Sequence, residues 1–413
     1  MLKIRVGDFK IGEEEKMVIN EILNSEKISE GEKVREFEVE FAKFVGTKYS
    51  VTVNSGTSAL IAGLVALKYW DGLEEVINKK NKKKVITTPL TYIATSNAIV
   101  LSGFEPVYVD IDPKTFVITP ENIKSHLEQV KDPSEYSIIL PVHLMGYPCD
   151  MVQINKLAKD YGLYVVEDSA QAHGTTYKGK KTGSLSLFGI FSFYIAHNIQ
   201  AGEMGAVTTD NLEIARLIKK IKANGRSCDC PVCKRAEGKC QKMVSSREED
   251  EDYDPRFVHE IIGYNFKAME FQAALALTQL RKVDWITRKR NENVKYLNEG
   301  LEELSDILQL PVYFKDVSYL AYPLVIKKPK LVNRKKLRYE LEKKGIETRP
   351  MFGCIPTQQP AYKFLKEKYD GRLPNAEYAG KNGFYLGCHQ YLKEEDLDYI
   401  IKTIKNIIKE KFR

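Results

Sequence analysis

The stretch Val165-Val166-Glu167-Asp168-Ser169-Ala170-Gln171-Ala172-His173-Gly174 joins a short apolar run to a polar turn. The run predicts a buried strand that ends at Asp168. Further strands are expected over 50–54, 84–89, 106–110 and 137–142, with helices over 32–46, 59–69, 92–101 and 150–161. This alternation predicts an α/β fold with a mostly parallel sheet and helices on both faces. Ligands bind such sheets at the carboxyl ends of the strands, so the turn after Asp168 is a candidate site.

The chain has 413 residues, which is enough for two domains with sizeable cores. We expect a large domain over 1–285, with a cysteine-rich insertion at about 226–256, and a smaller C-terminal α+β domain over 286–413. A long helical sequence at 269–303 leads out of the large domain. The small domain is expected to contain a strand over 319–326 and helices over 335–344 and 392–409.

The composition is typical of a globular enzyme, with 43% hydrophobic and 29% charged residues. A net charge of +7 is small for this length, and the basic run at 79–84 lacks an aromatic platform, so we expect no nucleic-acid partner. No apolar run reaches the roughly 18 residues that a membrane span needs. The N-terminus lacks the apolar core of a signal peptide, which predicts a cytoplasmic protein.

Two further stretches carry residues suited to chemistry. Gly56-Thr57-Ser58 lies between a strand and the start of a helix, where free N–H groups, hydroxyls and the positive helix end favour an anion. The stretch 191–205 contains Ser192 and, five residues later, His197. An imidazole has an unperturbed pKa of about 6.5, so His197 is a candidate for proton transfer.

From about Gly31 to Tyr362 the chain resembles the DegT/DnrJ/EryC1/StrS family of sugar aminotransferases, on the strength of the stretches 165–174 and 191–205 and the Gly56 turn. The resemblance implies the fold-type-I fold of pyridoxal-phosphate-dependent transferases, with a mostly parallel sheet of the seven-stranded type flanked by helices. It also implies a cofactor, pyridoxal phosphate (PLP) or pyridoxamine phosphate (PMP).

The resemblance gives the residues around this cofactor their roles. The cofactor phosphate would contact Gly56, Thr57, Ser58 and Ser192. Asp168 would pair with the pyridinium nitrogen and keep the ring an electron acceptor. Gln171 matches the residue that contacts the ring hydroxyl, and Tyr92 matches an aromatic side chain that stacks on the ring.

The segment 263–267 resembles one that reaches into a neighbouring subunit, where Asn265 would contact the partner's cofactor phosphate. The resemblance therefore implies a homodimer with shared active sites. Lys267 departs from the pattern, because aminotransferase members usually carry an arginine at this position.

His197 is the most informative departure. Members that transfer amino groups carry a lysine at this position, and that lysine binds the cofactor covalently, which an imidazole cannot do. The two subgroups with a histidine here are sugar 3-dehydratases, which remove the C3 hydroxyl of a nucleotide-linked 4-keto-6-deoxyhexose in 3,6-dideoxysugar biosynthesis. The resemblance thus implies a PMP/PLP-dependent hydro-lyase with His197 as its acid and base.

Four of the seven cysteines, Cys228, Cys230, Cys233 and Cys240, fall within 13 residues. Such clustering in a reducing compartment indicates metal ligation and not disulfides. One dehydratase subgroup holds a [2Fe–2S] cluster here and takes electrons from a partner iron–sulfur flavoprotein reductase, but one of its ligands comes from the position of Ala170, which cannot ligate. Four local thiolates suit an iron–sulfur cluster or tetrahedral zinc, and unligated thiols are the third alternative. Zinc would favour the other, glutamate-dependent subgroup.

Two other functions were compared with the dehydratase. A catalytically silent protein that senses a cofactor or sugar need not retain electron-sink groups such as Asp168 and Gln171. An aminotransferase would need another lysine, and the lysines at 178–181 lie in a glycine-rich hairpin out of register with His197.

Overall fold

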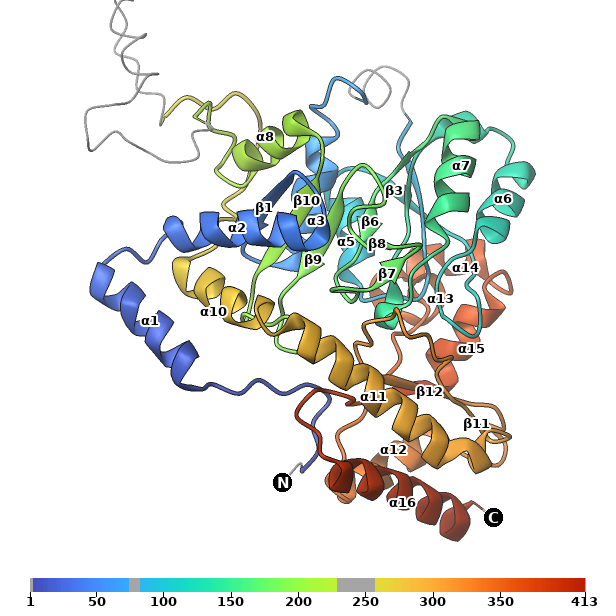
Figure 1. Cartoon of the computed structure of the whole chain (residues 1–413). Helices are drawn as coiled ribbons and strands as arrows, with labels where there is room; N and C mark the ends of the chain where they lie inside the picture. The colour runs from blue at the N-terminus through green and yellow to red at the C-terminus, as the bar shows by residue number, and fades with distance from the viewer. Residues whose placement is uncertain (1–2, 74–81, 229–256, 413) are drawn as a thin grey trace, which may run out of the picture.

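The structure, a computed structural model, describes residues 3–73, 82–228 and 257–412. Its larger part is built on a central sheet that lies above a smaller C-terminal part (Figure 1). Strands β5 (Tyr164–Val165) and β6 (Glu167–Asp168) are separated by Val166 alone and continue one another. If they are counted as one strand, the central sheet has seven strands in the order β3, β2, β4, β5/β6, β9, β10, β1.

The remaining strands of this sheet are β3 (Glu105–Tyr108), β2 (Lys84–Thr87), β4 (Tyr136–Leu140), β9 (Gly189–Ser192), β10 (Gly205–Thr209) and β1 (Tyr49–Val53). All are mutually parallel except β10, which pairs antiparallel with both β9 and β1. The expected mostly parallel sheet is therefore confirmed. The strands β9 and β10 were not anticipated from the apolar pattern.

Helices cover both faces of the sheet, because alternate residues of its strands face opposite sides. Ile190 and Val207 belong to the core that also contains residues of α3, α5, α7 and α8, whereas Phe191 and Ala206 pack with α2 and α10. The bounds of the helices in this part are α1 (Glu13–Ser25), α2 (Glu32–Val45), α3 (Gly56–Ala66), α5 (Ala94–Leu101), α6 (Pro120–Gln129), α7 (Met151–Tyr161), α8 (Leu212–Ile221) and α10 (Glu270–Leu280).

The single helix expected over 269–303 is two helices, α10 and α11 (Val283–Leu301), which are separated by Arg281 and Lys282. The break carries neither glycine nor proline, so no local signal marks it. Helix α11 runs from the larger part into the smaller one and spans residue 285, where we placed the domain boundary (Figure 1). That division of the chain stays a prediction.

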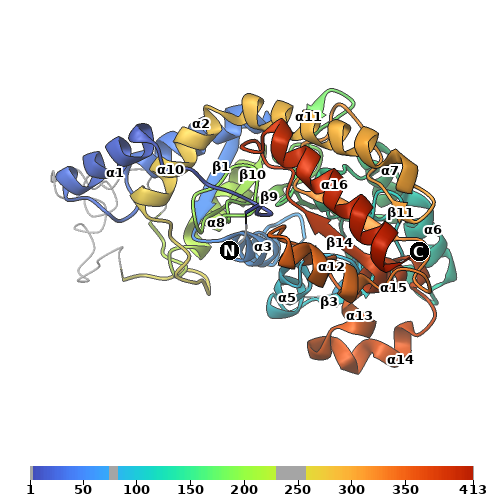
Figure 2. The same cartoon turned by 90° about the horizontal axis from the view of Figure 1, so that it is seen from below.

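The C-terminal part is an antiparallel sheet covered by helices. Its strands follow the order β11 (Leu308–Gln309), β12 (Tyr322–Ile326), β14 (Gly383–Leu386) and β13 (Arg349–Pro350). Its helices are α12 (Arg334–Lys343), α13 (Ile355–Gln358), α14 (Lys366–Tyr369), α15 (Pro374–Asn382) and α16 (Glu394–Lys411). Viewed from below, α16 lies across this sheet beside α11 and α12 (Figure 2).

The N-terminal residues belong with this C-terminal part. Ile4 forms a parallel bridge with Ile346, and the N–H of Val6 donates to Glu347 Oε2 at 2.8 Å. A hairpin of β7 (Thr176–Tyr177) and β8 (Lys180–Lys181) projects from the larger part. Among the described residues, no helix has both the length and the apolar character needed to cross a bilayer.

Candidate active site

Helix α3, the first helix after β1, begins beside serine hydroxyl groups. Ser55 caps α3 by accepting the N–H of Ser58 at 3.1 Å, and the two hydroxyl oxygens lie 2.9 Å apart. A Cβ atom at Gly56 would collide with the side chain of Ser192, which shows that these two residues touch. The structure thus brings together the two predicted phosphate-binding stretches, 56–58 and Ser192. Helix N–H groups and hydroxyls in this arrangement suit a phosphate.

Asp168 ends β6 as predicted, with only 4% of its surface exposed. Its Oδ2 accepts the Thr95 hydroxyl at 2.8 Å, and its Oδ1 accepts the N–H of Ala170 at 3.2 Å. Burial raises the pKa of this carboxyl, and the two hydrogen bonds oppose that rise. A cation placed against Asp168 would stabilise the ionised form, which is the environment that a pyridinium nitrogen provides.

Gln171 is buried in the turn after Asp168. Its Oε1 accepts the N–H of Met145 at 2.9 Å, and Met145 adopts a left-handed backbone with φ of 56°. Because the carbonyl end is anchored, the amide nitrogen is the end left to donate to a ligand. Tyr92 is 60% exposed, and its ring lies edge-on to Phe352 with centroids 6.1 Å apart.

His197 lies five residues beyond the end of β9, in a turn where its N–H donates to the carbonyl of Tyr194 at 2.9 Å. Its Nδ1 is buried and has no hydrogen-bond partner among the described residues. Burial and the nearby Arg290 guanidinium lower the pKa of His197 to about 4, against a weaker effect of the Ser192 backbone. The imidazole is therefore neutral at neutral pH and is able to accept a proton.

Arg290 is a fully buried cation in α11. It donates to the carbonyls of Tyr319 and Leu320, at 3.2 and 2.7 Å, and to Gln390 Oε1 at 3.2 Å. No described carboxylate pairs with it, so its positive charge acts on the histidines nearby. No motif or spacing in the sequence singles out this arginine.

The turn that carries His197 is held by residues from distant parts of the chain. Asn198 is fully buried and donates to Ser318, at 2.6 Å to the hydroxyl and 3.2 Å to the carbonyl. The Gln200 amide donates to the His197 carbonyl at 2.8 Å. On the N-terminal side, a Cβ atom at Gly7 would lie 3.2 Å from the Ala196 Cα. Sequence reasoning missed these contacts because the partners are far apart along the chain.

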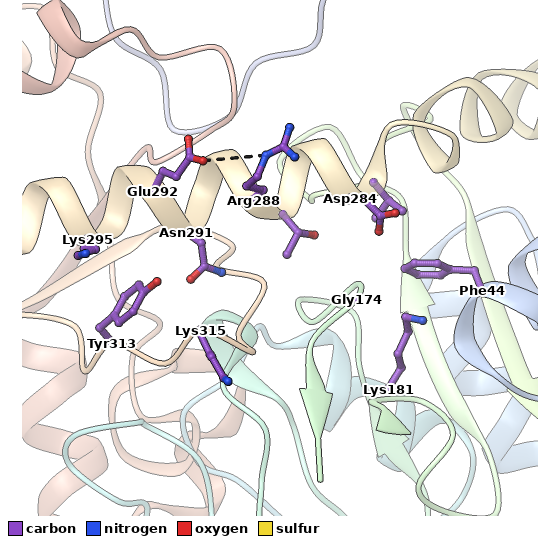
Figure 3. Close-up of a pocket in the computed structure, with 12 residues that line it drawn as sticks. Phe44, Gly174, Lys181, Asp284, Arg288, Asn291, Glu292, Lys295, Tyr313 and Lys315 are labelled. Carbon is purple, nitrogen blue, oxygen red and sulfur yellow. Dashed lines mark ion pairs between the residues drawn. The ribbon is translucent and has the colours of Figure 1, made fainter. Parts of the chain in front are cut away.

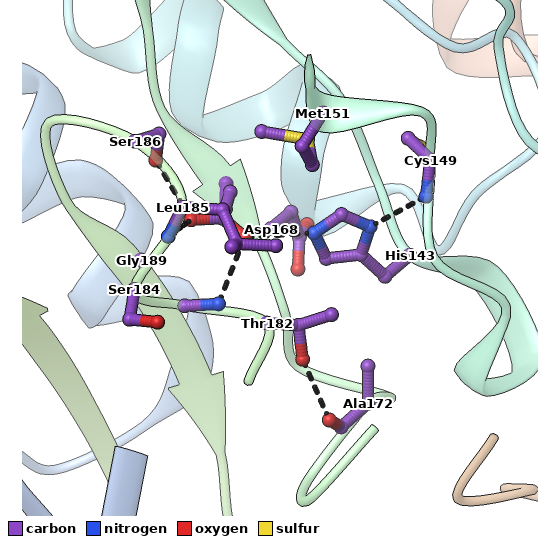
Figure 4. A network of polar contacts seen from close by, with 12 residues as sticks. His143, Cys149, Met151, Asp168, Ala172, Thr182, Ser184, Leu185, Ser186 and Gly189 are labelled. Carbon is purple, nitrogen blue, oxygen red and sulfur yellow. Dashed lines mark hydrogen bonds and ion pairs between the residues drawn. The ribbon is translucent and has the colours of Figure 1, made fainter. Parts of the chain in front are cut away.

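A second missed element is the buried pair of His143 and Glu167, the residue that precedes Asp168 in β6. Figure 4 shows His143 and Cys149 of this network beside the strand. The Cys149 N–H donates to His143 Nδ1 at 3.1 Å, so His143 Nε2 carries the proton that it shares with Glu167 Oε2 at 3.0 Å. Glu167 also accepts two backbone N–H groups and a hydroxyl, from Gly183, Leu185 and Ser186. This network fixes the end of β6 and thereby the position of Asp168. The signal in the sequence was an acidic residue, Glu167, inside a buried strand.

The other predicted site residues belong to the segments 228–240 and 263–267. Asn265 and Lys267 are exposed on the segment that leads into α10. Cys228 is a free, half-buried cysteine, whereas Cys230, Cys233 and Cys240 lie outside the described residues. In the part of the chain that the structure describes, no three His, Cys, Asp or Glu side chains gather as metal ligands.

The lysines of the hairpin lie beside aromatic rings. Lys181 Nζ lies 4.8 Å from the centre of the Phe44 ring, and Lys178 Nζ lies 5.3 Å from that of Tyr177. Neither ring belongs to the group around Asp168 and His197. This placement argues against the aminotransferase alternative that would use one of these lysines.

The sheet order and the similarity to solved structures define the fold-type-I class of pyridoxal-phosphate-dependent enzymes. The chain belongs to the DegT/DnrJ/EryC1/StrS aminotransferase family, whose model matches residues 9–405.

Relatives in this family are named for different activities. GDP-perosamine synthase of Escherichia coli O157:H7 is 33% identical over 96% of both chains. A dTDP-4-dehydro-2,6-dideoxy-D-glucose 3-dehydratase of Saccharopolyspora spinosa is 31% identical over 98% of this chain and 86% of its own. Among solved structures, the Escherichia coli GDP-4-keto-6-deoxy-D-mannose-3-dehydratase with bound hydrated PLP is 28% identical, with a TM-score of 0.84 over 98% of this chain and all of the other.

Proposed function

We propose that this protein is a PMP/PLP-dependent 3-dehydratase that removes the C3 hydroxyl of a nucleotide-linked 4-keto-6-deoxyhexose. The observation that carries the proposal is a half-buried His197, kept neutral by its lowered pKa, at the position where amino-transferring members hold a lysine. Relatives named as 3-dehydratases of dTDP- and GDP-linked sugars support the reaction and the substrate class.

The residues fit the cofactor. Ser192, Gly56 and the hydroxyls at the start of α3 would hold the phosphate, and Asp168 would hold the pyridinium proton. Gln171 would donate to the ring hydroxyl, and Tyr92 would cover one face of the ring. When bound, PMP supplies an amine that condenses with the 4-keto group and a ring that accepts electrons as the C3 hydroxyl leaves.

His197 performs the proton transfers in this proposal. With the cofactor bound, the neutral imidazole would accept a proton at the C4′ carbon, and the imidazolium would then donate a proton to the departing C3 hydroxyl. Such general acid–base catalysis typically contributes about 10²–10⁴-fold. The hydrogen bond between Asn198 and Ser318 fixes the residue next to His197 and would thereby keep the imidazole oriented for proton transfer.

In the proposed reaction the four clustered cysteines would serve electron transfer. We assign Cys228, Cys230, Cys233 and Cys240 as ligands of a [2Fe–2S] cluster that receives electrons from an iron–sulfur flavoprotein reductase. The alternative is structural zinc at the same thiolates, with glutamate restoring the amine of the cofactor. Iron, zinc and acid-labile sulfide measured on anaerobically purified protein separate the two, because only the cluster contains iron with matching sulfide.

The exposed Asn265 supports a homodimer with shared active sites. Asn265 is exposed on the segment that leads into α10, as is the nearby Lys267. In the proposed dimer it contacts the cofactor phosphate of the partner subunit.

The reaction is tested by product mass on nucleotide-linked 4-keto-6-deoxyhexoses, with PMP present and either glutamate or a reductase with NADH. A dehydratase yields a product that has lost the C3 oxygen. A product in which an amine replaces the 4-keto oxygen would instead identify an aminotransferase and overturn the proposal.

A further inference from the structure

His173 is a buried, titratable side chain that the proposed reaction does not use. It lies in the turn that follows Asp168 at the end of β6, and none of its surface is exposed. Neither of its ring nitrogens has a hydrogen-bond partner among the described residues. The next residue, Gly174, lines a cavity of about 410 Å³ beside α11, whereas His173 does not (Figure 3). The solvent in that cavity is therefore not the partner of the imidazole.

Three phenylalanine rings enclose the His173 imidazole. The Phe191 ring is stacked on it with centroids 5.4 Å apart, the Phe193 ring lies at 5.2 Å, and the Phe41 ring meets it edge-on at 6.5 Å. Phenyl rings offer an N–H group only a weak π acceptor and offer a lone pair no donor. Buried polar atoms without a partner are costly, and folded proteins contain few of them. A partner for His173 is therefore expected on the side that these rings leave free.

His197 is the polar ring next to this aromatic cage. The centroids of the two imidazoles lie 6.0 Å apart, and the ring planes are inclined at 62°. His197 Nδ1 is also buried and without a hydrogen-bond partner in the described parts of the chain. No direct hydrogen bond joins the rings at this separation, but a small ring rotation or one bridging water would connect a nitrogen of each ring. Such a link would satisfy two unpartnered nitrogens at once.

The charge states of the two rings limit how they can be linked. Burial, and after it His197 and Arg290, lower the pKa of His173 well below its ordinary value, so this imidazole is neutral at neutral pH. His197 is neutral as well, because burial and Arg290 lower its pKa to about 4. A neutral imidazole carries one N–H group and one lone pair. The direction of a hydrogen bond between the rings therefore fixes the tautomer of His197.

We propose that His173 is a positioning residue that accepts the Nδ1–H of His197, directly or through one water. The lone pair of His197 then lies on Nε2. Because His197 is half-buried and its Nδ1 is enclosed, Nε2 is the nitrogen left to face the cofactor. A carboxylate in place of His173 would stabilise the imidazolium, whereas a neutral ring fixes the tautomer and leaves His197 unprotonated. This inference rests on the proposed function, since it concerns the base of that reaction.

The tautomer of His197 tests the proposal without any turnover. It is measured by nitrogen-15 NMR of the PMP-loaded, full-length protein labelled at histidine, with the His197 signals assigned by their loss in His197→Asn. We expect the proton on Nδ1 in the unmodified protein. In His173→Phe, which keeps a ring in the cage and removes the acceptor, we expect the proton to shift toward Nε2. A proton on Nε2 of the unmodified protein, or the same tautomer in both proteins, overturns the proposal.

Restoration by amide side chains separates positioning from packing. His173→Phe should lower kcat about 2- to 10-fold with KM unchanged, which is the effect of about one neutral hydrogen bond. His173→Asn and His173→Gln each offer an amide oxygen near one of the two ring nitrogens, and we expect one of them to restore both the tautomer and the rate. Failure of both amides to restore the tautomer overturns the role of His173.

His126→Phe is the matched control, because it removes an imidazole of α6 that contacts the Tyr136 hydroxyl at 2.8 Å. It should change neither the tautomer of His197 nor kcat. The tautomer is measured without substrate, so a protein that lacks dehydratase activity would still show whether His173 orients His197. The two proposals can therefore fail separately.

Discussion

Replacement of Thr95 by valine tests how Asp168 is prepared to hold a cationic cofactor ring. The Thr95 hydroxyl donates to Asp168 Oδ2 at 2.8 Å inside a buried site, and valine removes that donor while keeping the side-chain shape. Burial already raises the Asp168 pKa, so loss of the donor makes the ionised carboxylate harder still to maintain.

The expected size follows from the kind of bond. A hydrogen bond to a charged group contributes about 1.5–3 kcal/mol, which corresponds to roughly 10- to 150-fold in an equilibrium constant. Thr95→Val should therefore weaken PLP binding by a factor in that range. Equilibrium dialysis of the apoprotein against PLP, followed by visible absorbance, gives the dissociation constant.

Thr91→Val is the matched control, because its hydroxyl lies 3.1 Å from that of Thr95 and contacts the carboxylate only through it. This control should bind PLP within a few-fold of the unmodified protein. If Thr95→Val and Thr91→Val have the same affinity as the unmodified protein, Asp168 does not hold the pyridinium proton in the manner described.

Three further predictions follow from the contacts around the site. Glu270→Ala removes the carboxylate that accepts the N–H groups of Gly31, Lys33 and Val34 at the start of α2, so it should lower the free energy of unfolding in urea by about 2–4 kcal/mol. The control Glu299→Ala, at an exposed position, should change that free energy by less than about 0.5 kcal/mol. Ser318→Ala removes the hydroxyl that accepts the Asn198 amide beside His197, so it should lower kcat about 5- to 10-fold with little change in KM. Recovery of the rate in Ser318→Thr would support this reason, and a rise in KM alone would argue against it. In the proposed mechanism His197 acts as a base in its neutral form, and its pKa is lowered to about 4, so kcat/KM should persist down to about pH 5 and fall as pH drops through 4. A loss centred near pH 6.5 would show that burial and Arg290 do not act on this imidazole.

Much of the sheet was predictable because its strands are short apolar runs separated by helical sequence. The strands β2, β3, β4 and β5/β6 and the helices α2, α5 and α7 lie where that pattern placed them. The strands β9 and β10 were not predicted; they overlap the two ends of the stretch 191–205, which we interpreted for its polar residues. The break between α10 and α11 has no glycine or proline to mark it, and only packing defines it.

The site was predictable only in its local parts. Asp168 ends its strand as expected, and Gly56 and Ser192, which the family resemblance assigns to the same phosphate, are in contact. Their roles toward a cofactor stay predictions. Residues that act through distant neighbours were not predictable. Glu270 caps a helix that begins more than two hundred residues earlier, and Ser318 holds the turn of His197 from another part of the fold.

The role of His197 is tested most directly by the His197→Asn variant, which removes the base and keeps a side chain of similar size. The variant is loaded with PMP, and loss of the C3 hydroxyl from a nucleotide-linked 4-keto-6-deoxyhexose is followed in a single turnover. We expect unchanged PMP binding and a dehydration rate lowered by about 10²–10⁴-fold. An unchanged rate with PMP bound would show that another group moves the protons and would remove His197 from the mechanism.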